Sequence, residues 1–444
     1  MSNTDRKQSV DSESAVLVGV QLSEDSYHGD PLDELTGLVE TAGATVVGRL
    51  TQKRQAPDAA TYVGHGKVDE LKFLVDATEA DVVIFDNDLS PAQIRNLEEA
   101  LKVKVLDRTE VILDIFSTRA QTHEARLAVE LAQLEYSLPR LKGMWKHLSR
   151  MKMGVGMRGP GEKQLETDRR LAEKRITDLR RDLEKVQKRK EREVAGRRDR
   201  MTVSLVGYTN AGKSTLMNAL TDAHVLAEDK LFATLDTRTR RWQLPGWGPV
   251  LLSDTVGFIR NLPHNLVASF KATLEEARQA DLLIHVADAS SPVALDQIKA
   301  VYDVLREIGI EEKDALLVLN KVDQVDDPSS LEAIRRLYPS AVTISARTGD
   351  GLPRLAAAVS DALSQDFLDL EFRFSVSNGR LLAYLAKYGE VISRTFSGDH
   401  ATVHCRLSRQ HLGALRDDPE IEIHPYVAAS INRRDADGAV GEVA

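Results

Sequence analysis

Residues 202–220 read TVSLVGYTNAGKSTLMNAL, and this stretch decides the fold of the region around it. It joins an apolar strand-like segment to the pattern G-x-x-x-x-G-K-S and then to an amphipathic helix, the context that a phosphate-binding loop requires. Gly207 and Gly212 permit a tight loop whose backbone N–H groups face phosphate oxygens. Lys213 supplies a positive charge for the β- and γ-phosphates, and Ser214 offers a hydroxyl to Mg²⁺. The stretch therefore predicts a nucleoside triphosphate site at a helix N-terminus.

Two later motifs also follow apolar strand-like segments, so both are expected at strand carboxyl ends, where open α/β sheets bind ligands. PVLLSDTVG at 249–257 ends in D-x-x-G; Asp254 is placed to hold the Mg²⁺ shell, and the Gly257 amide to meet a γ-phosphate. ALLVLNKVD at 315–323 ends in N-K-x-D, whose Asp323 can accept hydrogen bonds from N1 and the exocyclic amine of guanine. Adenine lacks that donor pair, so the motifs favour GTP over ATP.

A further strand and a switch segment complete the predicted site. AVTISAR at 341–347 ends in Ser345 and Ala346, where a backbone amide can reach the guanine oxygen. Between the phosphate loop and D-x-x-G lies KLFATLDTRTR at 230–240, which must offer a threonine to Mg²⁺ and sense the γ-phosphate. Three threonines qualify on chemistry alone. They are Thr234, Thr237 and Thr239.

Positive charge is concentrated in one part of an acidic chain. The 444 residues contain 59 Lys and Arg against 68 Asp and Glu, a net charge of −9. The segment 140–158 has six basic residues and no acidic one, and 140–200 carries +11, which leaves −20 for the rest. A concentrated basic element predicts contact with a polyanion. A solvated helix face is the alternative for the mixed-charge part, 162–200.

The region 15–118 alternates strand and helix patterns, which predicts a small α/β domain with a mostly parallel sheet. Ser90 followed by Pro91 marks a helix start, because serine caps the first amides and proline fits the first helical position. Residues 1–14 are expected to form a disordered tail. The strands are expected at 15–20, 44–50, 81–86 and 103–108, and the helices at 30–42, 66–78 and 91–101.

Two apolar stripes with heptad-like spacing predict two long helices within residues 119–199. The glycine-rich MGVGMRGPG at 153–161 interrupts them, so the sequence predicts an antiparallel helical hairpin with the basic segment at its tip. Pro139 lies inside the first stripe and is expected to kink that helix or end it early. The stripes are Leu127, Leu131, Leu134, Leu138 and Leu141, and Ala172, Ile176, Leu179, Leu183 and Val186.

The tip has the chemistry of an RNA contact. Arginine and lysine would meet phosphates, and Trp145 and His147 could stack on unpaired bases. A protein–protein coiled coil is the alternative use of such a hairpin. The candidate RNA contacts are Trp145, Lys146, Arg150, Lys152 and Arg158.

The remainder of the chain is predicted to form a GTPase domain at 200–366 and a small α+β domain at 367–444. The latter is expected to have strands at 370–376, 390–396 and 401–407 around a helix at 379–388, and it contains no motif. The single cysteine, Cys405, excludes a disulfide framework and a multi-cysteine metal site. With no membrane-length apolar run and no secretory signal pattern, we expect a cytoplasmic protein.

The motifs GYTNAGKS, FATLD, DTVGF, NKVD and SAR together resemble the translation-factor-related GTPases, and FATLD and DTVGF resemble the HflX family in particular. RAQTHEARLAVELAQLEYSLPRL at 119–141 and RGPGEKQLETDRR at 158–170 are also similar to that family, so the likeness covers roughly 15–366. The family loop is close to GGIGTRGPGE, whereas this chain has MKMGVGMRGPGE at 151–162, with fewer glycines.

The resemblance implies a Mg²⁺-dependent GTPase that binds GTP and GDP, engages the large ribosomal subunit and its RNA, and can separate ribosomal subunits or rescue stalled ribosomes, often under stress. It favours Thr234 as the switch threonine on Mg²⁺. We expect no DNA partner and a monomer when the protein is not bound to the ribosome.

The residues expected at the nucleotide fall into the five motifs. They are Gly207, Tyr208, Thr209, Asn210, Ala211, Gly212, Lys213, Ser214 and Thr215; Phe232, Ala233, Thr234, Leu235 and Asp236; Asp254, Thr255, Val256 and Gly257; Asn320, Lys321, Val322 and Asp323; and Ser345, Ala346 and Arg347. The residues expected at the metal are Ser214 and Thr234, with Asp254 in its outer shell.

No catalytic residue follows from the motifs. Ras-like enzymes have a glutamine directly after D-x-x-G that orients the attacking water, and here that residue is Phe258, which cannot hydrogen-bond. Either Phe258 is turned away while a partner or another residue orders the water, or intrinsic hydrolysis is simply slow. Both interpretations predict slow basal turnover that a partner stimulates.

Other functions remain open at this point. A GTP-switched hibernation or assembly factor that binds ribosomes without splitting them needs the same motifs. A helicase or RNA chaperone is disfavoured, because HGKVDEL at 65–71 has a Gly-Lys pair without the first glycine at phosphate-loop spacing. That segment is expected to be an ordinary helix start.

Overall fold

The computed structural model describes residues 10–22, 30–151, 160–195, 201–221, 231–232, 237–245, 248–260, 276–307, 309–310, 315–364, 367–408, 412, 415, 418 and 420–426. The chain forms two compact units, Met1–Ala358 and Val359–Ala444. Within these described residues, no helix combines the length and the apolar character needed to cross a bilayer. The domain boundaries given above stay predictions.

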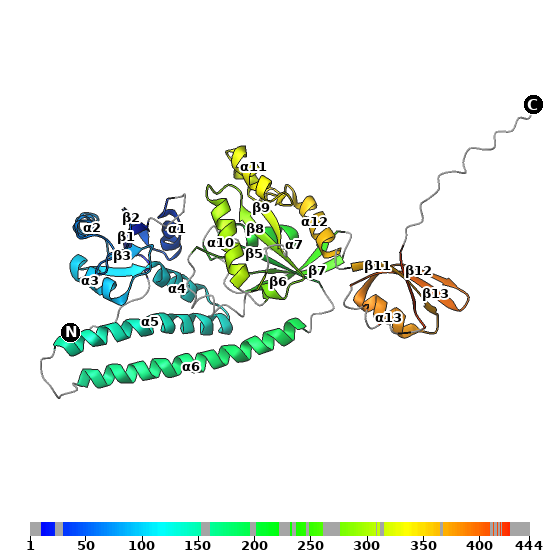
Figure 1. Ribbon diagram of the computed structural model, residues 1–444, viewed down its shortest axis with the longest axis horizontal. Coiled ribbons are helices and arrows are strands. Elements are labelled where there is room, and N and C mark those ends of the chain that lie inside the picture. Colours follow the sequence, from blue (N-terminus) through cyan, green and yellow to red (C-terminus); the bar gives the residue numbers. More distant parts are fainter. Residues whose placement is uncertain are drawn as a thin grey trace, which may run out of the picture. The chain divides into compact units, whose positions relative to one another are not determined.

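The first unit begins with a small sheet whose strands are all parallel, in the order β2-β1-β3-β4 (Figure 1). This is the arrangement that the strand–helix alternation predicts. The strands are β1 (Ser14–Leu22), β2 (Thr45–Arg54), β3 (Val82–Phe85) and β4 (Lys104–Asp107). The helices are α1 (Asp33–Thr41), α2 (His65–Thr78), α3 (Pro91–Leu101) and α4 (Arg108–Arg119).

Helix α4 is the element of this region that the sequence did not reveal. Asp107 is both the last residue of β4 and the N-cap of α4, where its carboxylate accepts a hydrogen bond from the Glu110 N–H at 3.0 Å. No turn residue separates strand from helix, so the usual boundary signal is missing. At α3 the signal is present and the prediction is confirmed: Ser90 caps the helix in a reciprocal pair with Gln93.

The predicted disordered tail is shorter than expected. Val10 is fully buried, and its N–H donates to an Asp114 side-chain oxygen at 3.2 Å. Residues 10–14 therefore belong to the fold, because one apolar side chain and one backbone hydrogen bond fix them. Residues 1–9 lie outside the described part of the chain.

Two long helices follow, α5 (His123–Met151) and α6 (Pro160–Ala195), and they lie side by side (Figure 1). Their buried contact comes from the predicted stripes: Leu127 and Leu131 pack with Ile176 and Leu179. The segment 152–159, which includes the predicted tip, lies outside the described residues. The antiparallel hairpin and its tip therefore stay predictions.

Pro139 does not end α5, so the expectation of an early end was wrong. The helix continues to Met151. Side chains on both sides of the proline are anchored to Asp107: the Tyr136 hydroxyl donates to this carboxylate, and Arg140 pairs with it at 2.9 Å. These bonds fix the helix where the proline removes one of its backbone hydrogen bonds.

The second sheet has the order β10-β9-β8-β5-β7-β6 and is parallel except for β6. Its strands are β5 (Thr202–Gly207), β6 (Arg238–Leu244), β7 (Gly248–Asp254), β8 (Leu282–Asp288), β9 (Ala315–Asn320) and β10 (Val342–Thr343). Its described helices are α7 (Lys213–Thr221), α10 (Ala294–Glu307), the 3-10 turn η2 (Val322–Gln324), α11 (Pro328–Leu337) and α12 (Leu352–Ser364).

The second unit contains a four-stranded antiparallel sheet in the order β12-β13-β11-β14, with α13 (Gly379–Tyr388) on its apolar face. The three predicted strands and the helix are present, and Cys405 lies buried between them. The fourth strand was missed because its four residues, EIHP, carry no alternating pattern. The strands are β11 (Phe367–Ser375), β12 (Gly389–Ser397), β13 (His400–Ser408) and β14 (Glu422–Pro425).

The contact between α5 and α6 gives a prediction on stability. Leu179 is fully buried, whereas Leu171 on the same helix is 60% exposed. We expect Leu179→Ala to lower the free energy of opening of the two helices by about 2–5 kcal/mol, because it leaves a cavity. Amide hydrogen exchange over α5 and α6 measures this, and Leu171→Ala is the control. Equal effects of the two variants would contradict the packing described here.

His285 gives a prediction on pH. This side chain of β8 is buried against Tyr302, with ring centroids 4.7 Å apart, and its Nδ1 has no hydrogen-bond partner in the described structure. Burial, assisted by the nearby Lys213 charge, lowers its pKa from 6.5 to about 3. The unfolded chain therefore takes up a proton below pH 6.5 that the folded chain does not, and stability falls as the pH drops from 6.5 towards 3.

From pH 7 to pH 5 this single group should lower the free energy of unfolding by about 2 kcal/mol. The variant His285→Phe keeps the ring and removes the titration. Urea unfolding at pH 7 and at pH 5 measures the loss of stability between these two values. The loss should be about 2 kcal/mol smaller in His285→Phe than in the unchanged protein. An identical pH dependence in both proteins would show that His285 titrates normally.

Candidate nucleotide-binding site

The predicted phosphate loop connects β5 to α7, with glycines at the two positions that require them. Gly207 and Gly212 both have positive φ, +151° and +90°. A Cβ at Gly207 would collide with the Val286 carbonyl oxygen, and one at Gly212 with the Asn320 side-chain amide. The loop is therefore held against two neighbouring strands, and only glycine fits at either place.

Lys213 and Ser214 are the first residues of α7, and the Lys213 ammonium is directed back at the loop. Lys213 is buried, and its Nζ donates to the carbonyl oxygens of Gly207 and Tyr208 at 3.1 and 2.9 Å. Burial lowers its pKa to about 8, while the Asp254 carboxylate opposes this shift. A phosphate at the loop would replace these neutral acceptors with charged ones, which favours the ammonium form.

The predicted metal ligands also come together. The Ser214 hydroxyl donates to an Asp254 carboxylate oxygen at 2.7 Å, and Asp254 is almost fully buried at the end of β7. A hydroxyl and a carboxylate are hard oxygen donors of the kind that Mg²⁺ prefers. The residues thus fit this ion. The other expected direct ligand, Thr234, lies outside the described residues, as do Ala233, Leu235 and Asp236.

The other two threonine candidates are described. Thr239 lies in β6 and its hydroxyl shares a hydrogen bond of 3.1 Å with Ser253 on β7. Thr237 directly precedes the same strand. Phe232 is buried, and its ring packs edge-on against Phe116 of α4 at 4.6 Å between centroids. A contact of Phe232 with the nucleotide stays a prediction.

Asn320 connects the phosphate side of the site to the base side. Its buried side-chain amide donates to the Ala211 carbonyl at 2.9 Å, and its Oδ1 accepts from the Ala346 N–H at 2.9 Å. One side chain thus joins three of the predicted motifs. The N-K-x-D motif predicts Asn320 at the nucleotide but does not reveal this cross-link, because the partners of Asn320 lie 109 and 26 residues away.

The surroundings of Asp323 favour its ionised form, which accepts hydrogen bonds. Hydrogen bonds from the Ser345 side chain and from Arg347, the latter at 2.5 Å, lower its pKa below the usual range. Lys321 beside it has a positive φ of +62° and pairs with Asp288 at 2.7 Å. An ionised Asp323 is the species that guanine recognition needs.

The D-x-x-G segment lies directly against the phosphate loop. The Phe258 N–H donates to the Gly207 carbonyl at 3.1 Å, and the Thr209 N–H donates to the Phe258 carbonyl at 2.7 Å. The Phe258 side chain is buried in the core. It therefore faces away from the phosphate side, as one of the two interpretations above allows. Thr255 is fixed by a hydrogen bond from its hydroxyl to the Leu205 carbonyl at 2.7 Å.

The candidate RNA contacts are only partly covered by the structure. Trp145, Lys146 and Arg150 lie on the last turns of α5, where only the backbone is described. Lys152 and Arg158 lie outside the described residues. Their role in RNA binding stays a prediction.

A buried group of charged residues joins the phosphate loop to the N-terminal sheet, and it was not predicted. The Tyr208 hydroxyl donates to Glu34 of α1 and accepts from the Arg260 N–H at 2.7 Å. Arg108 of α4 pairs with Glu34 at 3.0 Å and with Asp86 at 2.6 Å. Arg260 also pairs with Asp86, at 3.2 Å. We call Glu34, Asp86, Arg108, Tyr208 and Arg260 the junction cluster.

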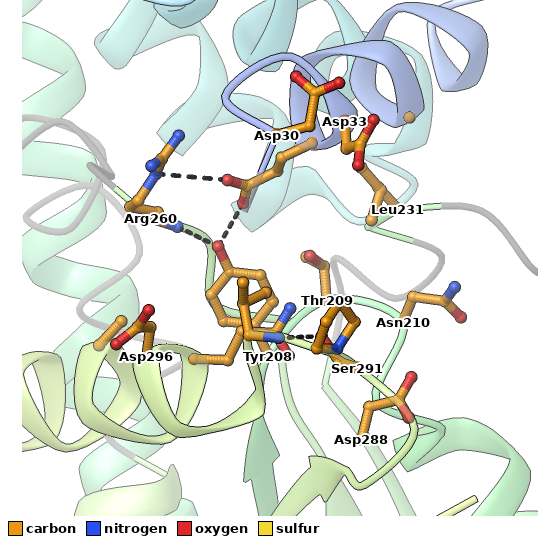
Figure 2. Close-up of a pocket in the computed structure, with 16 residues that line it drawn as sticks. Asp30, Asp33, Tyr208, Thr209, Asn210, Leu231, Arg260, Asp288, Ser291 and Asp296 are labelled. Carbon is orange, nitrogen blue, oxygen red and sulfur yellow. Dashed lines mark hydrogen bonds and ion pairs between the residues drawn. The ribbon is translucent and has the colours of Figure 1, made fainter. Parts of the chain in front are cut away.

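Figure 2 shows Tyr208, Arg260 and their neighbours at the edge of a cavity of about 330 Å³. The phosphate-loop residues Thr209 and Asn210 line it from one side, and Asp30 and Asp33 of the N-terminal region line it from another. The cavity therefore adjoins the loop at its exposed face.

Comparison with known proteins covers most of the chain. Residues 29–117 match the family model described as GTP-binding GTPase N-terminal, residues 119–197 that of the GTP-binding GTPase Middle Region, and residues 202–321 that of the 50S ribosome-binding GTPase. The protein named GTPase HflX from Lacrimispora saccharolytica is 44% identical over 411 residues, 92% of this chain and 96% of that protein. GTPase HflX from Escherichia coli (strain K12) is 48% identical over 375 residues, 83% and 87% of the two chains.

The chain belongs to the HflX family. The resemblance inferred from its motifs is thereby confirmed. As an HflX family GTPase it hydrolyses GTP to GDP and phosphate, and its fold is that of a multidomain α/β protein with a phosphate-loop GTPase domain and a helical region.

Asp323 gives a prediction on base selectivity. We expect Asp323→Asn to weaken GTP binding by about 100-fold or more, because two hydrogen bonds to a charged acceptor contribute about 1.5–3 kcal/mol each. The asparagine amide can instead donate to the 2-oxo group of xanthine, so binding of xanthosine triphosphate should improve. Calorimetry with non-hydrolysable analogues measures both affinities.

The matched control is Asp327→Asn. Asp327 caps α11 by accepting a hydrogen bond from the Ser329 N–H, and asparagine caps equally well. This variant should bind both nucleotides like the unchanged protein. Unaltered GTP affinity in Asp323→Asn would refute the assigned role of Asp323.

Proposed function

We propose that this HflX family GTPase binds the large ribosomal subunit and its RNA in the GTP state, and in doing so separates ribosomal subunits or rescues stalled ribosomes. GTP hydrolysis then triggers release. The relatives' family description, 50S ribosome-binding GTPase, and the basic segment at 140–158 both support this. The observation that carries the proposal is the junction cluster, because it joins the nucleotide loop to the part of the chain from which α5 extends.

In this proposal the five sequence motifs hold GTP, and Ser214 and Thr234 hold Mg²⁺, with Asp254 in the outer shell of the ion. The convergence of Lys213, Ser214 and Asp254 at one end of the sheet supports it. So does the Asn320 cross-link between the loop and the base motif. When bound, the ion neutralises the phosphate charge that develops during transfer.

The junction cluster supports communication between the nucleotide and α5. Tyr208 follows the first glycine of the loop, and Arg260 follows D-x-x-G by three residues. Both contact Glu34, which pairs with Arg108 at the start of α4. Asp107, the residue directly before Arg108, accepts a hydrogen bond from Tyr136 and pairs with Arg140, both of α5. A shift of the D-x-x-G segment upon GTP binding would therefore reach α5 through two adjacent residues, Asp107 and Arg108.

The proposed RNA contact is the tip of an antiparallel hairpin formed by α5 and α6. Ion pairs between the two helices, Arg175–Glu130 at 2.7 Å and Arg180–Glu135 at 2.7 Å, neutralise part of the charge along their length. The segment 140–158 has no acidic residue to do so. A narrow element with a cationic end suits an RNA crevice.

The proposal includes slow intrinsic hydrolysis that the ribosome accelerates. The buried Phe258 side chain supports it, since the residue directly after D-x-x-G cannot orient the water as a glutamine does. A purified protein that hydrolyses GTP rapidly and is unaffected by ribosomes would contradict this part.

The tip is tested by replacing Arg150, Lys152 and Arg158 with glutamate. We expect association with the large subunit to be lost at physiological salt, because phosphate contacts dominate RNA affinity. The slope of log affinity against log salt concentration should fall by about 2–3, for three lost contacts. Cosedimentation with separated subunits, with GDP or a non-hydrolysable GTP analogue, measures both.

The control makes the same charge change at Arg181, Lys185 and Lys188 of α6, which are exposed and lie along its length. It should retain most of the binding. If association survives the tip change, the tip is not the RNA contact. Light scattering of intact ribosomes with protein and GTP then separates splitting from binding alone, since a hibernation or assembly factor would leave the signal unchanged.

A further inference from the structure

The buried Phe258 leaves the attacking water of the reaction without an assigned partner. A group that orients this water must lie beside the γ-phosphate, and it must both accept and donate hydrogen bonds. Lys213 only donates, and it is already expected at the β- and γ-phosphates. Among the polar side chains of the phosphate loop, that of Thr209 approaches the D-x-x-G segment at Gly257.

The position of Thr209 is fixed by the two segments that enclose the γ-phosphate side of the site. Its N–H donates to the Phe258 carbonyl at 2.7 Å, which places it between the loop and D-x-x-G. A Cβ built on Gly257 would lie 2.8 Å from the Thr209 methyl carbon and 3.1 Å from Lys213 Nζ. Thr209, Gly257 and the Lys213 ammonium therefore converge on one small region.

The Thr209 hydroxyl has no hydrogen-bond partner among the described residues, although the residue is only 6% exposed. A buried hydroxyl without a partner is unfavourable, and such a group calls for a functional explanation. Two of the other buried polar atoms without a partner among the described residues, the Ser204 hydroxyl and His285 Nδ1, lie in the middle of β5 and β8. Thr209 differs from them because it lines the cavity beside the loop (Figure 2).

We propose that Thr209 Oγ1 is a catalytic hydroxyl that orients the attacking water, in the role that glutamine has in Ras-like enzymes. This inference rests on the proposed nucleotide site. The hydroxyl accepts a hydrogen bond from the water and donates its own to a γ-phosphate oxygen. The water oxygen forms a bond to the γ-phosphorus, the bond from that phosphorus to the β–γ bridging oxygen breaks, and the water's proton passes to the released phosphate. Thr209 itself stays protonated throughout.

The side chain suits this role because it is stiff. Threonine is branched at Cβ, which restricts its χ1 rotation. Contact of its methyl group with Gly257 holds the rotamer, so the hydroxyl is oriented before the nucleotide arrives. A preorganised donor of this kind costs no rearrangement at the moment of reaction.

The test compares Thr209→Val, which keeps the shape and removes the hydroxyl, with Thr209→Ser, which keeps the hydroxyl. The rate of hydrolysis of bound GTP in a single turnover should fall by about 100-fold in Thr209→Val, with ribosomes and without them. Thr209→Ser should stay within about tenfold of the unchanged protein. The Kd for a non-hydrolysable GTP analogue should change less than about threefold in both, because the effect lies in the transition state.

Thr221→Val is the matched control, since the Thr221 hydroxyl only bonds the Met217 carbonyl within α7. It should keep the full rate. Three outcomes overturn the inference: an unchanged rate in Thr209→Val, equal losses in the valine and serine variants, or a loss of affinity with no loss of rate. Failure of the unchanged protein to bind or hydrolyse GTP would instead refute the nucleotide site on which the inference rests.

Discussion

The structure depends on a buried cluster of charges at the point where the phosphate loop meets the N-terminal sheet. Arg108 is almost completely buried, and although burial alone would lower its pKa, Glu34 and Asp86 raise it above the usual value. Burial and the Glu34 charge likewise raise the pKa of Tyr208. The phenol therefore stays protonated and donates a hydrogen bond to that carboxylate. Removing one partner from such a group leaves a buried charge uncompensated, which lowers the free energy of unfolding by about 3–5 kcal/mol.

This cluster ties the phosphate loop to the N-terminal sheet region. Tyr208 belongs to the phosphate loop and Arg260 follows D-x-x-G, and both are tied to Glu34. The hydrogen bonds between Phe258 and the loop are short and local, so a shift of either segment is transmitted to the other. Coupling between two sites is reciprocal. If GTP and GDP favour different arrangements of the N-terminal region, then each arrangement must in turn favour the nucleotide that stabilises it.

Prediction from the sequence is strongest where the relevant chemistry is local. The phosphate loop, D-x-x-G and N-K-x-D are short segments whose backbone geometry requires particular residues, and Ser90–Pro91 announces a helix in the same way. It failed where one residue has two roles or where partners are distant. Asp107 ends a strand, caps a helix and anchors α5, and no local pattern distinguishes it from an ordinary strand end. The partners Asp86 and Arg260 are 174 residues apart in the chain, and only the fold brings them together.

The ion pairs between α5 and α6 determine where the positive charge of this region stays uncompensated. The exposed ion pairs between α5 and α6 contribute little to stability, since each is worth no more than about 1 kcal/mol. Their consequence is electrostatic: they offset the positive charge of α6 with acidic residues of α5, such as Glu130 and Glu135. The uncompensated charge is then left to the segment 140–158, while the rest of the chain is strongly acidic. In the proposed complex with RNA, this separation of charge would orient the molecule in the field of the polyanion before contact is made, and the neutralised pairs along α5 and α6 would add little affinity.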